Sequence, residues 1–446
     1  MSPAGRDTLF HSYRWRSSTA QDSETSVKKK TAPRIAVRLT RTCGPILALG
    51  LMASGPAQGQ VQAQAQERPW TVSASQAVRY DSNVFRAERG SPSETDVSSI
   101  TSLDGRLRAR LGRQEAYVAA GASAHRYRDN DQLDFTGTAL ETGLNWATVE
   151  RLSGTVRYVQ HRGLAVYGAA GAPQTTDRVL ERAQLGEASV RFGMTSRSAL
   201  VASLAQRRVD YSVVEYEDRE YQQNVASLGY QYGIERALVL GVGARYTRER
   251  TPRYDEPTPG NFVSNRGTRR DLDFTAVWQA SGLSTVSARL SATRQRYTQA
   301  DEADFSGATG TLRWEYRPSG RLSLNTQLDR DTGAEARFAG FAGEAPDQSV
   351  ESRRLVNSAQ LEALYELTGK TRMNARLRHA RSKLSDGAGT TGHDNTNTYG
   401  LGIEYNPTRT LLLGCEAGQE NRSSRSSLSY SYRATVAQCL IRLTLD

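Results

Sequence analysis

Apolar and polar side chains alternate with a period of two along much of the chain. The clearest case is Tyr399–Gly418, in which two alternating runs are joined by Asn406–Arg409. In each run one face is mainly apolar, and the other is mostly small or charged. Successive side chains of a β-strand point to opposite faces, and Asn-Pro marks a turn. The stretch therefore predicts a β-hairpin with one apolar face.

The same unit recurs along the chain, because short turn signals follow one another at intervals of about 40 residues. These signals are Gly112–Glu115, Ala147–Glu150, Thr195–Ser198, Gly233–Arg236, Gln279–Gly282, Arg317–Gly320, Leu367–Lys370 and Asn406–Arg409. Each interval leaves room for two strands of roughly 10 residues and one longer connection. The pattern predicts an antiparallel, up-and-down arrangement of strands.

An aromatic side chain ends the apolar face of the strand that enters almost every turn. The aromatic residues are Trp146, Phe192, Tyr232, Trp278, Tyr316, Tyr365 and Tyr405, and Leu111 takes this position before the first turn. A lipid-facing band needs amphipathic rings at its water interface, whereas a soluble sandwich has no reason to repeat them at one level. We interpret the set as one aromatic girdle of a transmembrane β-barrel. Tyr80, Tyr127, Tyr211, Tyr246 and Tyr297 are candidates for a second girdle, with scattered loop tyrosines as the alternative.

Side-chain parity predicts nine upward and nine downward strands between Thr71 and Leu445. An all-β transmembrane barrel of about 18 strands satisfies the even number that bacterial barrels show, and 16 strands is the nearest alternative. The longer connections are predicted at Asp81–Ser98, Arg128–Asp134, Arg162–Arg182, Val209–Glu220, Thr247–Thr268, Tyr297–Asp304, Asp329–Ser352, Ser382–Asn395 and Gln419–Leu428. By the usual asymmetry, these connections face outside the cell and the short turns face the periplasm.

The N-terminus has the layout of a secretory signal peptide. Lys28–Lys30 and further arginines precede the apolar run Gly44–Ala53, and small residues around Ala63–Ala65 follow it. We expect cleavage after Ala65, with residues 57–59 as another candidate region, and an N-terminal extension from a misassigned start before Lys28. Residues 1–65 then form the signal segment, and residues 66–446 form a barrel in the outer membrane of a Gram-negative cell, in contact with its lipid.

Charge and hydropathy exclude two classes of protein. No stretch approaches the roughly 20 consecutive apolar residues that a transmembrane helix needs. The net charge is +11, with 58 basic and 47 acidic residues. Residues 1–65 hold nine of the basic and three of the acidic residues, so 49 basic residues face 44 acidic ones in the rest of the chain. Nucleic acid is therefore not an expected partner.

Alternation also predicts a polar lumen. In the second strand Asp104 shares the inward face with Arg106, Arg108 and Arg110. The same parity places further arginines inward, namely Arg157, Arg191, Arg245, Arg289, Arg313, Arg376 and Arg378. Two interpretations remain open: these arginines pair with lumenal carboxylates and brace the wall, or they form a basic track for an anionic polymer.

Catalysis is not expected, and no cofactor is predicted. The histidines after the signal segment are His125, His161, His379 and His393, which lie far apart without metal-ligand spacing. Serine is so frequent that a chance pairing with one of them carries no weight.

Cys415 and Cys439 are the cysteines that remain after signal removal. Pairing them in the last hairpin also places Leu413 opposite Ile441, so that both strands reach the same rim. Directly opposed positions on one face lie within disulfide reach, and the export route is oxidising. We predict a disulfide, with two free thiols against lipid as the alternative.

The first predicted connection begins with Tyr80-Asp-Ser-Asn-Val-Phe-Arg86. Asp81, Ser82 and Asn83 are turn formers that bond their own backbone, while Val84 and Phe85 are expected to fold back on the barrel mouth. This run, the late Asn406–Arg409 turn and Cys439 in a final Cys-x-x-x-x-Leu strand resemble the exosortase-associated exopolysaccharide-biosynthesis outer-membrane proteins of the EpsL type. The resemblance implies an outer-membrane barrel that serves polysaccharide export together with periplasmic export machinery. The terminal Leu445-Asp446 departs from the aromatic end that is usual in such barrels.

Two functions from different classes follow. The first is an outer-membrane channel that exports an extracellular polysaccharide, with a partly basic lumen suited to an anionic polymer. The second is a general diffusion porin for small solutes, for which Arg162–Arg182, Thr247–Thr268 and Asp329–Ser352 are long enough to constrict the channel. A structural or adhesive surface barrel is a third hypothesis.

Overall fold

The computed structural model describes residues 69–445 except 170–171, 173, 196, 235–236, 333–354 and 386–390. The predicted signal segment therefore lies outside the described residues. The strands are β1 (Trp70–Asp81), β2 (Asp96–Leu111), β3 (Gln114–Tyr127), β4 (Phe135–Ala147), β5 (Leu152–Leu164), β6 (Leu180–Gly193), β7 (Ser198–Tyr211), β8 (Tyr221–Ile234), β9 (Leu238–Thr258), β10 (Asn261–Ser281), β11 (Ser284–Tyr297), β12 (Phe305–Tyr316), β13 (Leu322–Asp331), β14 (Leu355–Glu366), β15 (Thr371–Ser385), β16 (Thr391–Tyr405), β17 (Leu411–Ser424) and β18 (Tyr432–Leu445). Three short 3₁₀ turns, η2 (Asp131–Leu133), η3 (Val214–Arg219) and η4 (Asp301–Ala303), lie between strands.

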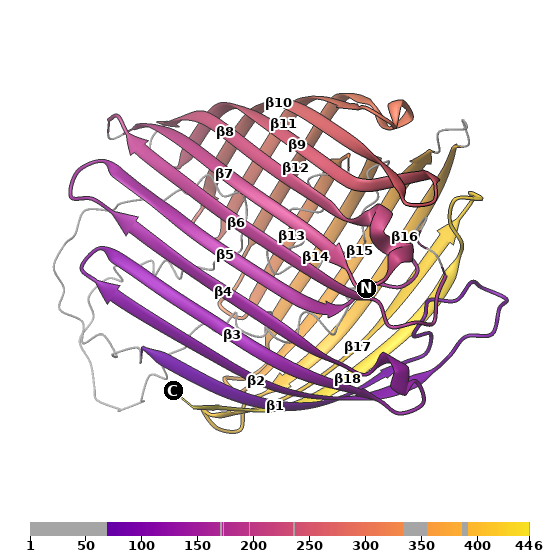
Figure 1. Cartoon of the computed structure of the whole chain (residues 1–446). Coiled ribbons are helices and arrows are strands. Elements are labelled where there is room, and N and C mark those ends of the chain that lie inside the picture. The colour runs from indigo at the N-terminus through magenta and orange to yellow at the C-terminus, as the bar shows by residue number, and fades with distance from the viewer. Residues whose placement is uncertain are drawn as a thin grey trace.

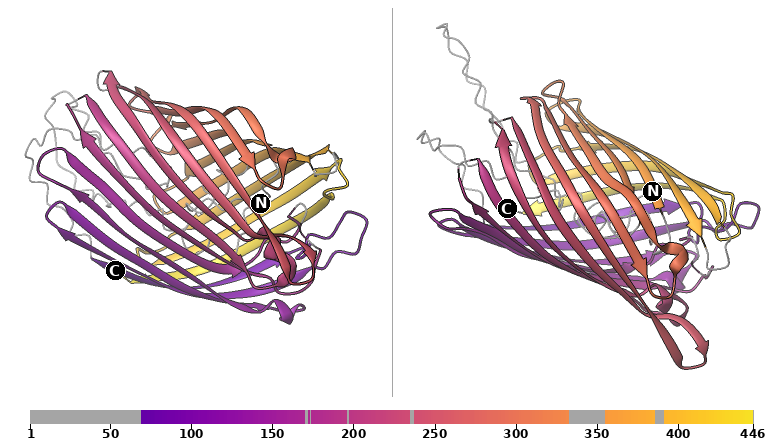
Figure 2. Two further views of the ribbon diagram at one scale, coloured as in Figure 1. Left: turned by 45° about the horizontal axis from the view of Figure 1, so that its top comes forward. Right: turned by 90° about the horizontal axis from the view of Figure 1, so that it is seen from above.

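The strands form one closed barrel (Figures 1 and 2). Each strand pairs antiparallel with the next, and β1 closes the barrel by pairing with both β2 and β18. The 18 strands confirm the predicted number and exclude 16. All eight predicted turns join consecutive strands at one end of the barrel, which we call the turn end; the opposite end, where the longer connections lie, is the loop end.

Hydrogen-bond register keeps side-chain parity constant around the wall. Shifts occur only between Gln279 and Ser281 at the turn end and between Asn261 and Asn265 near the tip of β9–β10, within the pairings of the described strands. Because a one-residue slip would exchange the two faces, this continuity gives every strand one inward and one outward face. Side chains at odd positions face inward on β1 and from β3 to β13, and those at even positions face inward on β2 and from β14 to β18.

The outward faces carry the apolar side chains. Phe192, Tyr232, Trp278, Tyr365 and Tyr405 are 41–51% exposed at the turn end, which confirms the predicted aromatic girdle. Leucine is the most frequent of the exposed large apolar side chains. A closed antiparallel barrel with an apolar outer band and a polar interior is the architecture of bacterial outer-membrane proteins, and the chain is a barrel of the Gram-negative outer membrane. Among the helical segments of the described residues, none has the length and apolar character for a membrane span.

The prediction of a second girdle is wrong for three of its five tyrosines. Tyr80 and Tyr246 face outward with 40% and 41% exposure. Tyr127, Tyr211 and Tyr297 instead occupy inward positions of β3, β7 and β11. The reason is parity, which the irregular spacing of these tyrosines concealed.

Two predicted connections are largely strand. Thr247–Thr268 is not a loop, because β9 and β10 continue for 21 residues each and meet at a tight tip around Gly260, where φ is +79°. This hairpin extends beyond its neighbours (Figure 2, right). In Ser382–Asn395, β15 runs to Ser385 and β16 begins at Thr391. Backbone pairing continues past the rim in both cases, although proline and glycine in these segments are typical of loops.

Candidate functional site

The inner wall is lined by charged side chains that pair across neighbouring strands. Arg157 on β5 lies between two carboxylates, with Nε 2.9 Å from Glu141 on β4 and Nη1 3.3 Å from Glu187 on β6. All three positions face inward by register. The pattern is the one expected when lumenal charges brace the wall.

A larger network lies on β9 and β10. Asp271 accepts a 2.9 Å ion pair from Arg269 and lies 3.7 Å from Arg245. Arg245 also contacts Asp273 at 3.1 Å, and Arg269 reaches Asp331 on β13 at 2.6 Å. The Asp271 side chain is fully buried, and both arginine side chains are at most 4% exposed. Charges so buried are held by their partners rather than by water.

Arg106, Arg108 and Arg110 of β2 lie beside an acidic residue of the neighbouring strand. Glu115 on β3 lies directly opposite Arg110. Its carboxylate oxygens lie 2.8 Å from Nε of Arg110 and 3.7 Å from Nε of Arg108. Asp104 lies on the same face of β2, two residues beyond Arg106 in the direction away from the turn end. Parity within β2 alone places one acid, Asp104, beside the row, whereas the folded wall has two.

The other predicted lumenal arginines are distributed around the barrel rather than gathered. Arg376 pairs with Glu362 at 2.9 Å, Arg313 donates to Gln327 at 2.6 Å, and Arg191 donates to Gln231. Arg289 and Arg378 occupy inward positions of β11 and β15. Acidic and basic side chains are thus interspersed around the wall.

The segment after β1 folds into the mouth of the barrel. The backbone N–H of Asn83 donates to Asp81 at 3.0 Å, and that of Ala87 donates to the Asn83 side chain at 2.7 Å. These bonds confirm the expected turn. Arg86 has φ = +56°, and its guanidinium bonds both oxygens of Asp81 at 3.0 Å and Glu420 at 3.3 Å. Because Asp81 and Glu420 face inward on β1 and β17, Arg86 fixes this connection inside the rim.

The connection between β5 and β6 folds inward beside it. Gly168, with φ = +71°, lies against Arg86, and its carbonyl accepts a hydrogen bond from the inward-facing Arg422 of β17. A Cβ added at Gly168 would lie 2.5 Å from the Cβ of Arg86, so the close approach requires glycine. Arg422 also stacks over the Tyr432 ring at 4.8 Å. The β1–β2 and β5–β6 connections therefore contact each other, and both are hydrogen-bonded to β17.

An apolar cluster joins four connections at the loop end. We call it the mouth cluster: Val84, Leu133, Ala165, Tyr167, Val179 and Tyr216. Phe85 packs edge-on against Tyr167 with ring centroids 5.4 Å apart, and the inward-facing Tyr127 and Tyr211 pack against the cluster from the wall. Burial of this kind ties the four connections together beside inward-facing side chains of the wall.

Charge and burial set the ionisation of the mouth residues. Burial alone would lower the pKa of Arg86, but the carboxylates of Asp81 and Glu420 raise it above its ordinary value. Burial raises the pKa of Tyr167 and of Tyr216. The arginine therefore stays charged and the two tyrosines stay neutral across the physiological range.

Sequence reasoning missed most of the mouth cluster. Of the cluster, the sequence indicated only Val84, together with the adjacent Phe85, and it offered Arg162–Arg182 as one of three connections long enough to constrict the channel. Tyr167 and Tyr216 stand in segments without periodicity, so the available signal was only an aromatic ring inside a long connection. No group of three His, Cys, Asp or Glu side chains among residues described in the structure has the geometry to hold a metal.

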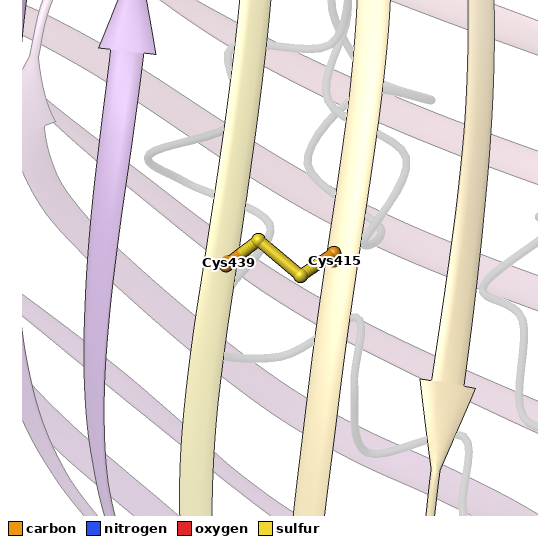
Figure 3. Close-up of a disulfide and its surroundings, with 2 residues drawn as sticks. All are labelled: Cys415 and Cys439. Atoms are coloured by element: carbon orange, nitrogen blue, oxygen red, sulfur yellow. A yellow bond between two sulfur atoms is a disulfide. The ribbon is translucent and has the colours of Figure 1, made fainter.

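Cys415 and Cys439 lie directly opposite each other on β17 and β18. Their sulfur atoms are bonded at 2.13 Å, and the bridge spans the outward faces of the two strands (Figure 3). Leu413 pairs with Ile441 as the predicted register requires. The bridge thus lies on the lipid side, away from the lumen.

No family model matches the sequence, and a search of curated proteins finds no match. Solved structures similar to the chain include OccK1 (OpdK) of Pseudomonas aeruginosa, with 12% identity, a TM-score of 0.46, and coverage of 84% of this chain and 99% of that one. OccK2 (OpdF) of the same organism has 13% identity, a TM-score of 0.45, and coverage of 84% and 97%. The FrpB iron transporter of Neisseria meningitidis has 9% identity, a TM-score of 0.42, and coverage of 85% and 81%. Similarity at this level carries no argument about substrate.

Proposed function

We propose that the chain is a porin-like channel through which small polar solutes diffuse across the outer membrane. The observation that carries this proposal is the mouth cluster, in which separate connections fold inward over lumenal side chains. A barrel of 18 strands encloses an aqueous interior wide enough for more than water and ions, so an inward-folded mouth sets the size limit. The third hypothesis, a purely structural barrel, gives no reason for a polar lumen.

The lumenal charges favour small solutes of either sign. Arg157, Arg245 and Arg376 each have a carboxylate within 3.1 Å on a neighbouring strand. Paired charges keep the wall wet without producing a strong field of one sign. A general pore needs this property, whereas a dedicated polyanion conduit needs a surplus of positive charge along its whole length.

Conductance of the purified barrel in a planar bilayer tests the proposal. Wild-type protein is expected to form open, ohmic pores. Replacing Tyr167 and Tyr216 together with Ala removes both aromatic rings of the mouth cluster and is expected to raise the single-channel conductance. Tyr80→Ala combined with Tyr246→Ala, on the outward face, is the matched control and should leave conductance unchanged. A closed wild-type barrel, or equal conductance in all three proteins, contradicts the proposal.

Export of an anionic polysaccharide is the second candidate, and one observation favours it. Arg106, Arg108 and Arg110 form a continuous inward row near the turn end, where a polymer from the periplasm would enter, with Asp104 and Glu115 as neighbouring acids. The resemblance to EpsL-type proteins supports the same candidate, with periplasmic export machinery as a partner. Gene deletion separates the two: loss of extracellular polysaccharide with intact small-solute uptake favours export, and the reverse favours the porin.

A further inference from the structure

Basic side chains gather on the outward face of the wall as well, all of them toward the loop end. We call them the basic collar: Arg126, Arg162, Arg182, Arg208, Arg248, Arg250, Arg266, Arg270, Arg294, Arg296, Arg330, Arg381, Lys383 and Arg433. All of them are exposed. Below the β9–β10 tip, Asp210 is the one acid at an outward position of the described strands, so this face carries a large positive surplus.

The collar lies at the upper edge of the apolar band. On β9 the outward positions from Leu238 to Tyr246 are apolar or aromatic, and Arg248 and Arg250 follow directly. Ten residues separate Leu238 from Arg248. At about 3.3 Å per residue and a tilt of roughly 40°, Arg248 stands about 25 Å above Leu238, which equals the usual height of the apolar band. Because the longer connections of bacterial barrels face outside the cell, the collar meets the head groups of the outer leaflet.

Several collar arginines oppose one another directly. Register places Arg250 opposite Arg266 and Arg270 opposite Arg294, and it places Arg162 opposite Arg182 on β5 and β6. Directly opposed side chains on one face lie within about 5.5 Å at Cβ, and like charges there destabilise a sheet. Around the described part of the collar, acids pair only with Arg126, Arg208 and Arg296. An anion from outside the protein would therefore stabilise these like-charge pairs.

We propose that the basic collar binds the phosphate groups of the phosphorylated glycolipid that forms the outer leaflet, the lipid A type. Guanidinium groups match phosphate oxygens with two parallel hydrogen bonds, and an opposed pair of arginines presents two such forks to one headgroup. A lipid source fits the position of the collar, because the acyl chains of the same molecule would lie against the apolar band directly below. The inference does not depend on what the lumen transports.

Binding of defined lipids to the folded barrel in neutral detergent tests the proposal. The probes are bisphosphorylated lipid A, the same lipid without phosphates, and inorganic phosphate. We expect the phosphorylated lipid to bind at least roughly tenfold more tightly than the dephosphorylated one, and inorganic phosphate alone to show no comparable affinity. Binding should weaken as salt rises toward about 1 M.

Variants assign the binding to the collar. Replacing Arg250, Arg266, Arg270 and Arg294 with Ser is expected to weaken lipid A binding about fivefold for each arginine removed, whereas replacing all four with Lys should retain most of it. The inward replacement of Arg106, Arg108 and Arg110 with Ser is the matched control and should not affect binding. Should the fourfold Ser variant fail to fold, Arg270→Ser with Arg294→Ser serves in its place. Equal affinity for both lipids, equal affinity for inorganic phosphate, or wild-type binding by the collar variants overturns the proposal.

Discussion

Arginine side chains of β9 and β10 have acidic neighbours on the inner face of the wall and basic neighbours on its outer face. Inside, Arg269 and Arg245 converge on Asp271. Outside, one residue further along β10, Arg270 faces another arginine, Arg294. In this network the inward charges are offset by carboxylates of the wall, whereas within the described residues Arg270 and Arg294 have no ion pair with an acid. At these positions, side-chain parity therefore separates charged residues that stabilise the wall from charged residues that face the surrounding medium.

The largest expected effect is on the inner face. Asp271→Asn removes the charge that two buried arginines share and should lower the free energy of unfolding by about 4 kcal/mol. Arg270→Gln, the adjacent residue on the outer face, is the control and should change stability by no more than about 0.5 kcal/mol. Urea unfolding of the refolded barrel measures both. Similar losses for the two variants would show that parity does not separate these roles.

The second effect concerns the outer face, where Cys415 and Cys439 form the covalent link between β17 and β18. Replacing both with Ser should lower stability by roughly 3 kcal/mol, because the bridge closes a loop with a sequence separation of 24 residues. The same unfolding measurement under non-reducing conditions detects the loss. Mass spectrometry of unreduced peptides gives an independent check, and finding both cysteines alkylated would mean that they are free thiols.

The smallest effect is on ion selectivity. Replacing Arg106, Arg108 and Arg110 with Ser should shift the permeability ratio toward cations by on the order of twofold, since Glu115 and the other lumenal pairs remain. Reversal potentials in a salt gradient across a planar bilayer measure the shift. The fourfold collar variant changes charge only outside and should keep the wild-type ratio. An unchanged ratio in the lumenal variant would leave its arginines as wall-bracing residues.

The wall was predictable because its signals are local. Period-two alternation, eight short turns and the aromatic girdle need only neighbouring residues, and together they specify strand number and facing. The partner of Arg110 was not predictable from its own strand, because Glu115 becomes its neighbour only through the β2–β3 register. The basic collar was predictable in the same way. The side-chain parity that places one set of residues in the lumen places the alternate set on the outward face.

The mouth and the long hairpin depend on contacts that local sequence does not contain. Arg86 meets Glu420 across 334 positions of the chain, so neither residue alone indicates the bond. On β9 and β10, Pro252, Pro257 and Gly260 indicated a loop, yet pairing continues to Thr258 and Asn261. The mutual pairing of two strands beyond the rim outweighed the local preference of those residues.

The unbroken register of the wall also limits how the sequence can change in length. One residue inserted within β10 would move Asp271 to the lipid face and Leu272 to the lumen, along with every later position of that strand up to the turn. A charge on the lipid face is destabilising, and more so the closer it lies to the bilayer midplane, so such an insertion carries several penalties at once. Insertions and deletions are therefore expected in the connections of related barrels, or in pairs within strands, while the residue count between a turn and its aromatic girdle stays constant.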